Sequence, residues 1–223
     1  MELWELLHIR PGVTALIGGG GKTTAMYTLA WELSRRAAVI CTTTTHILPP
    51  DHLPVLPGDD QSALQTALSR QNCVCVGVPT AEGKLAAPEL SPARLAGLAD
   101  YVLVEADGSR GLPVKAHLPH EPVIPDGAGL TVVLAGASGF GRPVREAVHR
   151  WEQFRRLTGA SPEDPVTPEN AAKLLKTEDF GDIVFVNQAE TPDALAQAGR
   201  LAALLDRPVC AGSLRGGKWI CLS

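Results

Sequence analysis

A glycine-rich segment that ends in a lysine and two threonines has the residue types needed to bind phosphate. Backbone N–H groups of such a segment converge on phosphate oxygens, and a helix that begins there adds partial positive charge. Lys22 would neutralise the terminal phosphates, and Thr23 would offer its hydroxyl to Mg²⁺. The residues expected to bind the nucleotide phosphates are Gly18, Gly19, Gly20, Gly21, Lys22, Thr23 and Thr24.

The spacing of this loop differs from that of the commonest phosphate loop, which would place a glycine where the chain has Leu16. A second form, KGGxGK[ST], occurs in the branch that includes the Min and nitrogenase-iron-protein ATPases. The segment 17–23 resembles that form, except that Ile17 replaces its first lysine. Because that lysine reaches across a dimer, the resemblance implies a phosphate site without an in-trans lysine. A flexible glycine turn is the alternative.

Two carboxylates follow another apolar run and could bind a metal ion. Glu105 and Asp107 come directly after YVLV, and in an extended chain they face the same side. Two such carboxylates attract a divalent cation. We expect Thr23, Glu105 and Asp107 to hold Mg²⁺, and Lys22 and Asp107 to be catalytic, with Asp107 orienting the attacking water. A strand end with solvated acids is the alternative.

A third group of polar residues follows a later apolar run. Asn187, Gln188 and Glu190 lie in VNQAE, which resembles the guanine-reading NKxD motif with Gln188 for lysine and Glu190 for aspartate. We expect these three residues to contact the base of a nucleotide. ATP and GTP both stay open, as does a polar loop that only begins the next helix.

These segments must be positioned by a fold that alternates strands and helices. Short apolar runs predict buried strands at 13–18, 37–42, 73–78, 101–106, 131–136, 182–187 and 207–212, with a possible edge strand at 218–223. Helices are predicted at 22–36, 61–70, 92–99, 144–158, 168–176 and 192–205. This order predicts a P-loop NTPase-like three-layer α/β/α fold with a mostly parallel sheet, in one domain over 1–223.

Composition excludes several classes of protein. The chain carries 20 basic and 24 acidic residues, a net charge of −4, which argues against nucleic-acid binding. No apolar run approaches the roughly 20 residues that span a bilayer, and the first residues do not resemble a secretion signal. We therefore expect a cytoplasmic protein with no membrane partner. The five cysteines fit buried, reduced thiols.

Basic residues gather in the loop that follows the two acids. Arg110, Lys115 and His117 lie in a region rich in proline and glycine, 108–129. They could meet phosphate or an anionic substrate, and a solvated loop is an equal alternative. His117 and His120 form an HxxH pair, but Pro119 argues against the regular helix that a metal site of this kind uses.

Taken together, these motifs resemble the selenium-dependent hydroxylase accessory proteins, called YqeC-like. The segments that carry the resemblance are GGGGKTT, TTTTHI, the run 100–125, VHR at 148–150 and VNQAE at 186–190. The resemblance implies a nucleotide-binding protein linked with the maturation of selenium-dependent molybdenum hydroxylases. Its partners would be such a hydroxylase or the proteins that mature its cofactor.

The sequence thus predicts a protein that binds Mg²⁺ with ATP or GTP and hydrolyses the nucleotide slowly. Hydrolysis would switch the 108–129 loop and so act on a partner or a cofactor. One alternative is a non-hydrolysing module that carries a nucleotide or a molybdopterin-dinucleotide cofactor, because no arginine finger is evident. A second is a small-molecule kinase whose basic loop binds the acceptor. The oligomeric state stays open.

Overall fold

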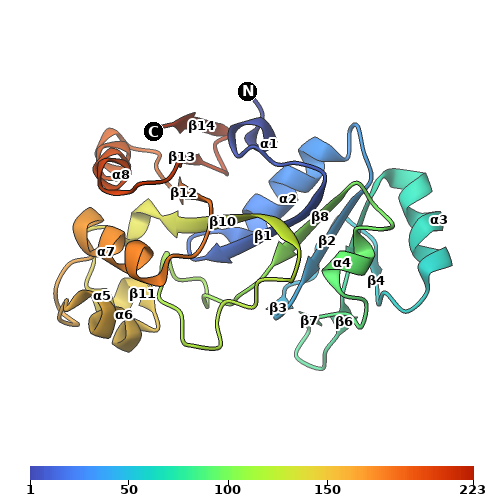
Figure 1. Ribbon diagram of the computed structural model, residues 1–223, viewed down its shortest axis with the longest axis horizontal. Coiled ribbons are helices and arrows are strands. Elements are labelled where there is room, and N and C mark those ends of the chain that lie inside the picture. The colour runs from blue at the N-terminus through green and yellow to red at the C-terminus, as the bar shows by residue number, and fades with distance from the viewer. The chain divides into compact units, whose positions relative to one another are not determined.

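The computed structural model describes residues 1–223, and the chain divides into two compact units, each formed by three segments. Unit 1 comprises Met1–Leu16, Thr23–Gly108 and Val123–Thr131, and unit 2 comprises Ile17–Lys22, Ser109–Pro122 and Val132–Ser223. Figure 1 shows the helices and strands of each unit along the chain. The expectation of one domain over 1–223 stays a prediction.

Unit 1 contains a parallel sheet with the strand order β1–β8–β2–β5–β4. Its strands are β1 (Gly12–Gly18, of which the first five residues belong to unit 1), β2 (Val39–Thr43), β4 (Val55–Leu56), β5 (Cys73–Val76) and β8 (Tyr101–Glu105). All residues of β2 and β8 are buried, as expected of strands covered on both faces. Because β2 and β8 are parallel, Thr43 and Glu105 end at the same edge and are register partners.

Four helices and a small sheet complete unit 1. The helices are α1 (Leu3–Leu6), α2 (Lys22–Leu33, of which Lys22 belongs to unit 2), α3 (Gln61–Gln71) and α4 (Pro92–Leu95). The small antiparallel sheet consists of β3 (His46–Ile47), β6 (Val78–Pro79) and β7 (Leu85–Ala86). Asp60 and Ser91 cap α3 and α4, because their side chains accept hydrogen bonds from first-turn N–H groups.

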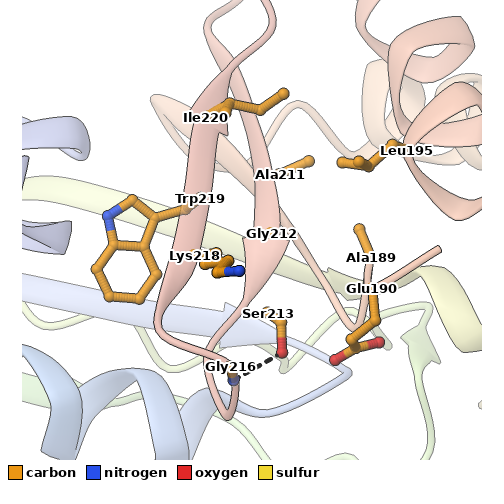
Figure 2. Close-up of a pocket in the computed structure, with 10 residues that line it drawn as sticks. All are labelled: Ala189, Glu190, Leu195, Ala211, Gly212, Ser213, Gly216, Lys218, Trp219 and Ile220. Atoms are coloured by element: carbon orange, nitrogen blue, oxygen red, sulfur yellow. Dashed lines mark hydrogen bonds between the residues drawn. The ribbon is translucent and has the colours of Figure 1, made fainter. Parts of the chain in front are cut away.

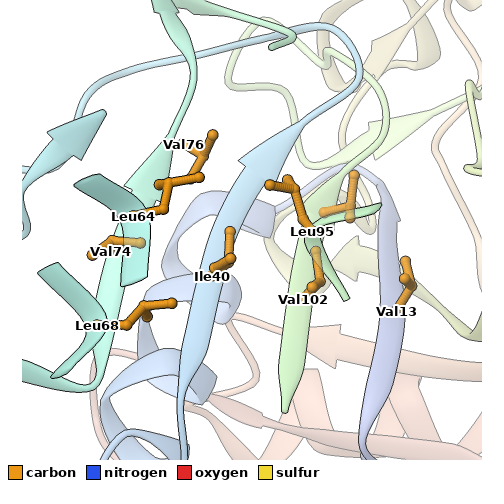
Figure 3. Close-up of a cluster of buried hydrophobic side chains, with 9 residues drawn as sticks. Val13, Ile40, Leu64, Leu68, Val74, Val76, Leu95 and Val102 are labelled. Atoms are coloured by element: carbon orange, nitrogen blue, oxygen red, sulfur yellow. The ribbon is translucent and has the colours of Figure 1, made fainter. Parts of the chain in front are cut away.

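Helices cover both faces of the unit 1 sheet. Leu64 and Leu68 of α3, with Leu95 of α4, pack against apolar strand residues such as Ile40 and Val102. Figure 3 shows these side chains on the near face of the strands and α2 behind them. Each buried leucine contributes about 1.5–3 kcal/mol of transfer free energy. The predicted α/β class and its layering of helices over a mostly parallel sheet are therefore confirmed.

Unit 2 contains a second stretch of sheet with the strand order β14–β13–β12–β10. Its strands are β10 (Ala128–Gly136, of which the last five residues belong to unit 2), β12 (Ile183–Asn187), β13 (Val209–Ser213) and β14 (Lys218–Cys221). The β10, β12 and β13 strands are parallel, whereas β14 pairs antiparallel with β13. The predicted edge strand at the end of the chain is thus confirmed.

The remaining elements of unit 2 are short strands and helices. A separate pair of parallel strands is formed by β9 (Val114–Lys115) and β11 (Val148–His149). The helical elements are η1 (Ala137–Gly139), α5 (Val144–Ala147), α6 (Trp151–Thr158), α7 (Pro168–Glu178) and α8 (Pro192–Leu204). Thr167 and Thr191 cap α7 and α8 through their hydroxyls, with proline at the first helical position, as the sequence predicts.

The helix predicted over 144–158 is wrong, because a strand interrupts it. Val148 and His149 form β11 and pair with β9, and Arg150 then has a φ of 64° before α6 begins. A residue in this left-handed region cannot continue an α-helix. Pairing with a strand more than thirty positions earlier in the chain therefore overrides the local helical pattern. The helix predicted over 92–99 is also shorter, and α4 ends at Leu95.

The cysteines agree with the prediction of buried thiols except at one position. Cys41, Cys73, Cys75 and Cys210 are buried and free, whereas Cys221 is free but exposed on the edge strand β14. Burial raises the pKa of Cys75 to about 12, so its thiol is protonated and unreactive at neutral pH. None of the helices combines the length and apolar composition needed to cross a membrane.

Candidate functional site

The glycine loop, residues 18–21 of unit 2, packs so closely against neighbouring backbone that side chains do not fit there. Gly18 and Gly20 have φ angles of +94° and +73°, in the left-handed region that favours glycine. A Cβ on Gly18 would overlap the carbonyl oxygen of Leu134, and one on Gly20 would overlap the backbone nitrogen of Gly136. Glycine is therefore required at positions 18 and 20 for this backbone conformation and packing.

Two N–H groups of this loop bond to neighbouring backbone. Gly19 N donates to Leu134 O at 2.9 Å, and Gly20 N donates to Leu112 O at 3.1 Å. These bonds fix the shape of the loop. The first turn of α2 follows the loop, and helical N–H groups in a first turn lack carbonyl partners within the helix.

Lys22 folds back over the loop that precedes it. Its Nζ donates to Gly18 O at 2.6 Å and to Ser109 Oγ at 3.3 Å, and the residue is only 3% exposed. The ammonium group is thus held over the loop carbonyl, where a short charge-assisted hydrogen bond orients it. Sequence analysis missed Ser109, because a serine two positions after a predicted acid has no distinguishing pattern.

Unit 1 brings Thr23 and Glu105 together. Thr23 Oγ1 donates to Glu105 Oε2 at 2.7 Å, and Glu105 is 6% exposed. The backbone oxygen of Glu105 accepts a hydrogen bond from Thr43 Oγ1 at 2.8 Å, which fixes the end of β8 against the end of β2. A hydroxyl and a carboxylate in contact at the end of a parallel strand are the ligand types that Mg²⁺ prefers. Asp107 is buried two residues beyond, at 1% exposure.

Asn187 connects the glycine loop to the end of β13. Its Nδ2 donates to Gly20 O at 2.7 Å, and its Oδ1 accepts from Leu214 N at 3.0 Å. Both ends of the amide are therefore used on the protein's own backbone. Gln188, with a φ of 62°, accepts a hydrogen bond from Ser138 Oγ at 2.5 Å through Oε1.

Glu190 lines a cavity of about 360 Å³ in unit 2, between the β13–β14 hairpin and the beginning of α8. Ser213 and Lys218 are register partners on the hairpin side, and Leu195 of α8 closes the other side. Figure 2 shows Glu190 and Leu195 on one side of the hairpin, with the ring of Trp219 directed to the opposite side. Ser213 Oγ accepts a hydrogen bond from Gly216 N at 2.9 Å and so shapes the hairpin turn between β13 and β14.

Thr24 lies apart from these contacts, on the exposed side of α2. It lines an open hollow in unit 1 with Tyr27, Trp31 and His52, and Trp31 is 64% exposed. The Tyr27 and His52 rings meet edge to face at 5.8 Å. Sequence analysis missed this aromatic hollow, because Trp31 fits the helical pattern of a packed residue.

Comparison with known proteins identifies the family. The YqeC protein family model matches residues 14–152. A protein of Escherichia coli (strain K12), named "Uncharacterized protein YqeC", is 37% identical over 177 residues, which are 75% of this chain and 68% of that protein. The chain belongs to the YqeC family. The family resemblance noted in the sequence is therefore confirmed, and that relative's name assigns it no reaction.

The family match includes part of the candidate site. Residues 14–152 contain the glycine loop, Thr23, Glu105 and Asp107, whereas Asn187 and Glu190 lie beyond the matched range. In this YqeC-family chain the glycine loop, Lys22 and Asn187 form one connected group in unit 2, and Thr23 and Glu105 form another in unit 1. The first group offers the Lys22 ammonium group and N–H groups as hydrogen-bond donors. The second group offers hydroxyl and carboxylate oxygens, which can act as metal ligands.

Proposed function

We propose that this protein binds ATP or GTP with Mg²⁺ and hydrolyses the nucleotide slowly. The observation that carries this proposal is the 2.7 Å hydrogen bond from Thr23 Oγ1 to Glu105 Oε2. It holds two oxygen ligands in contact, one residue after a lysine that is folded over a glycine loop. Oxygen ligands of these two types fit Mg²⁺, so Thr23 and Glu105 would hold the ion, with Asp107 directly or through water.

The phosphates would bind at the end of the loop and the beginning of α2. Gly21, Thr23 and Thr24 would donate backbone N–H groups, while Gly18, Gly19 and Gly20 shape the loop. Lys22 would exchange the carbonyl of Gly18 for a phosphate oxygen, because an ammonium group bonds more strongly to an anion than to a neutral carbonyl. This exchange gives the lysine a direct part in binding the terminal phosphates.

The base would occupy the cavity beside Glu190. Asn187 supports this assignment, because its amide joins Gly20 in the loop to Leu214 at the end of β13. The Glu190 carboxylate would accept hydrogen bonds from N–H groups of the base, with Gln188 beside it. Lys218 and Ser213 offer the opposite polarity across the cavity, so guanine and adenine both find partners.

Hydrolysis would depend on charge stabilisation and positioning. Mg²⁺ neutralises developing charge on phosphate oxygens when it is bound. Lys22 would stabilise the same charge, and Asp107 would orient the attacking water. We further propose that the protein acts in the cytoplasm as an accessory factor in the maturation of selenium-dependent molybdenum hydroxylases. The basis for this role is the resemblance of the sequence motifs to selenium-dependent hydroxylase accessory proteins, and such a hydroxylase or its cofactor-maturation proteins would be the partners.

Calorimetric titration with ATP and with GTP, each with and without Mg²⁺, tests the proposal. We expect saturable binding that strengthens with Mg²⁺ and falls at least about tenfold in Lys22→Ala, because a charge-assisted contact is lost. Lys176→Ala is the matched control, since Lys176 is half exposed and pairs with Asp206. Absence of binding to both nucleotides would refute the proposal.

Product analysis then separates hydrolysis from the alternatives. Free phosphate released by the wild type and lost in Lys22→Ala supports slow hydrolysis. Binding with no turnover would favour a non-hydrolysing carrier module, for a nucleotide or a molybdopterin-dinucleotide cofactor. Phosphate transfer that requires an added acceptor would favour a small-molecule kinase. Equal turnover by the wild type and Lys22→Ala would contradict hydrolysis at this loop.

A further inference from the structure

A second group of charged side chains lies in unit 2, on the two-stranded sheet of β9 and β11. Lys115 and His149 are register partners across this sheet, so their side chains lie next to each other on one face. The Lys115 side chain is 0% exposed, and His149 is 8% exposed. The expectation of a solvated basic loop is therefore wrong for Lys115, which is held inside the protein.

One carboxylate bridges two of the cations in this group. Glu121 Oε2 lies 3.5 Å from Lys115 Nζ, and Glu121 Oε1 lies 3.3 Å from Arg150 Nη2. Both distances exceed the 2.7–2.9 Å or so of strong charge-assisted hydrogen bonds. Burial opposes ionisation of Glu121, but Arg150, Lys115 and the Leu118 N–H outweigh burial and lower the pKa of Glu121. The carboxylate is therefore ionised at neutral pH and orients both cations.

Arg150 has a buried donor that the protein does not satisfy. Its Nε is buried and makes no hydrogen bond, although the side chain as a whole is 36% exposed. A buried guanidinium N–H without an acceptor is unfavourable, and more so than a neutral N–H, because the group is charged. Arg150 also has a φ of 64°, and Arg110 has a φ of 51°, conformations that non-glycine residues seldom adopt. An acceptor supplied by a ligand would remove the cost at Nε.

The pKa of His149 is lowered by burial and by basic groups around it. Its pKa is lowered by burial first, and then by Lys115 and Arg150, with a smaller lowering by Arg110 and an opposing effect of Glu121. These four groups come from β9, the beginning of α6 and the 109–122 segment. Lys115, Arg150 and Arg110 thus act on His149 together with a single carboxylate, that of Glu121, so basic groups outnumber acidic groups around His149.

We propose that Arg110, Lys115, His149 and Arg150 form a second anion site, which binds a phosphate-type oxyanion. The occupant would be inorganic phosphate or the phosphate group of a small molecule, because guanidinium forks and an ammonium group together match its oxygens. Glu121 orients Lys115 and Arg150. The site uses none of the residues 18–24 and stands independently of nucleotide binding.

Proton and nitrogen NMR signals of the histidine rings in the full-length protein test this site directly. Inorganic phosphate is titrated at constant ionic strength, His149→Asn assigns the His149 signals, and sodium chloride is the reference. We expect a saturable shift at His149 and a rise in its pKa, because a bound anion offsets the neighbouring cations. A shift equal to that with chloride, or no saturable shift, would overturn the proposal.

Variants identify where the phosphate binds. Lys115→Met should abolish the saturable response, and Arg150→Lys, which keeps the charge and removes Nε, should weaken it about tenfold. If Lys115→Met does not fold, Arg150→Lys decides alone, and unchanged affinity there refutes the proposal. Lys22→Ala should keep the response, and its loss would place the phosphate at the glycine loop instead. Titrations with glycerol phosphate and with inorganic phosphate are compared, which distinguishes a small-molecule phosphate from free phosphate as the occupant. Nucleotide binding is measured separately by calorimetry.

Discussion

Asn187 donates a 2.7 Å hydrogen bond from Nδ2 to the carbonyl oxygen of Gly20, and its Oδ1 accepts from Leu214 N at 3.0 Å. One buried amide thereby joins the glycine loop to the end of β13. The resemblance to a base-reading motif predicts that Asn187 contacts the base. Since both ends of its amide are already bonded to backbone, we interpret its main role as positioning.

Replacement of Asn187 should remove the hydrogen bonds that join the glycine loop to the end of β13. We expect both the stability of the protein and its nucleotide affinity to decrease. Asn187→Ala removes two hydrogen bonds and leaves Gly20 O and Leu214 N without partners, which costs about 1–3 kcal/mol for each stranded group. Asn187→Asp should be at least as destabilising, because a carboxylate replaces the donor to Gly20 O. Urea unfolding measures the free energy, and calorimetry measures the nucleotide affinity. Unchanged stability in both variants would show that the bonds carry no net energy.

A methyl group on Gly20 should disrupt the loop. The added Cβ would overlap Gly136 N and Cα, and alanine is strained at a φ of +73°. We expect Gly20→Ala to destabilise unit 2 by more than about 1 kcal/mol and to reduce nucleotide binding. Gly199→Ala is the matched control, since Gly199 lies in α8 with open space around its Cα. It should stabilise the protein by up to about 1 kcal/mol.

Removal of the Thr23 hydroxyl should reduce the gain in nucleotide affinity that Mg²⁺ gives more than it reduces nucleotide affinity without Mg²⁺. Thr23→Val keeps the shape of the side chain but deletes the donor to Glu105, whereas Thr23→Ser keeps the hydroxyl. We expect Thr23→Val and Glu105→Gln to lose most of the increase in nucleotide affinity that Mg²⁺ gives, and Thr23→Ser to keep it. Calorimetry with and without Mg²⁺ measures the difference. If Mg²⁺ raised the nucleotide affinity of Thr23→Val as much as that of the wild type, Thr23 would not be a Mg²⁺ ligand.

The sequence predicts those helices and strands whose positions depend only on residues close to them in the chain. The buried strand 101–105, with Glu105 at its end, follows from a continuous apolar run. The α7 and α8 helices begin where Thr167 and Thr191 precede proline, because both residues act through contacts within one turn. These signals need no information about distant parts of the chain.

The features that the sequence does not predict depend on distant contacts. Val148 and His149 form a strand only because β9 lies beside them, and Lys115 is buried for the same reason. The bond from Asn187 to Gly20 joins residues 167 positions apart, so no local spacing could distinguish it from a contact with a base. Side-chain direction and long-range pairing therefore limit prediction at the site more than residue type does.

The lowered pKa of His149 should make the protein less stable as the pH falls below neutrality. An unfolded histidine has a pKa near 6.5, and burial together with Lys115 and Arg150 lowers the pKa of folded His149 below that value. Between the two pKa values the unfolded chain binds more protons, so the free energy of unfolding decreases as pH falls from about 6.5 toward the folded pKa. Each unit of pKa difference corresponds to about 1.4 kcal/mol. Urea unfolding at several pH values between 5 and 8 measures this slope.

His149→Gln identifies the source of that slope. The variant keeps a polar side chain without a titrating ring, so the decrease in stability just below pH 6.5 should become smaller than in the wild type. The lowered pKa of Glu121 acts in a separate window, because its stabilisation is lost only as pH falls below about 4.5. His120→Gln is the control, since it removes another histidine of the same loop. A slope that is the same in His149→Gln and the wild type would mean that other groups govern the pH dependence.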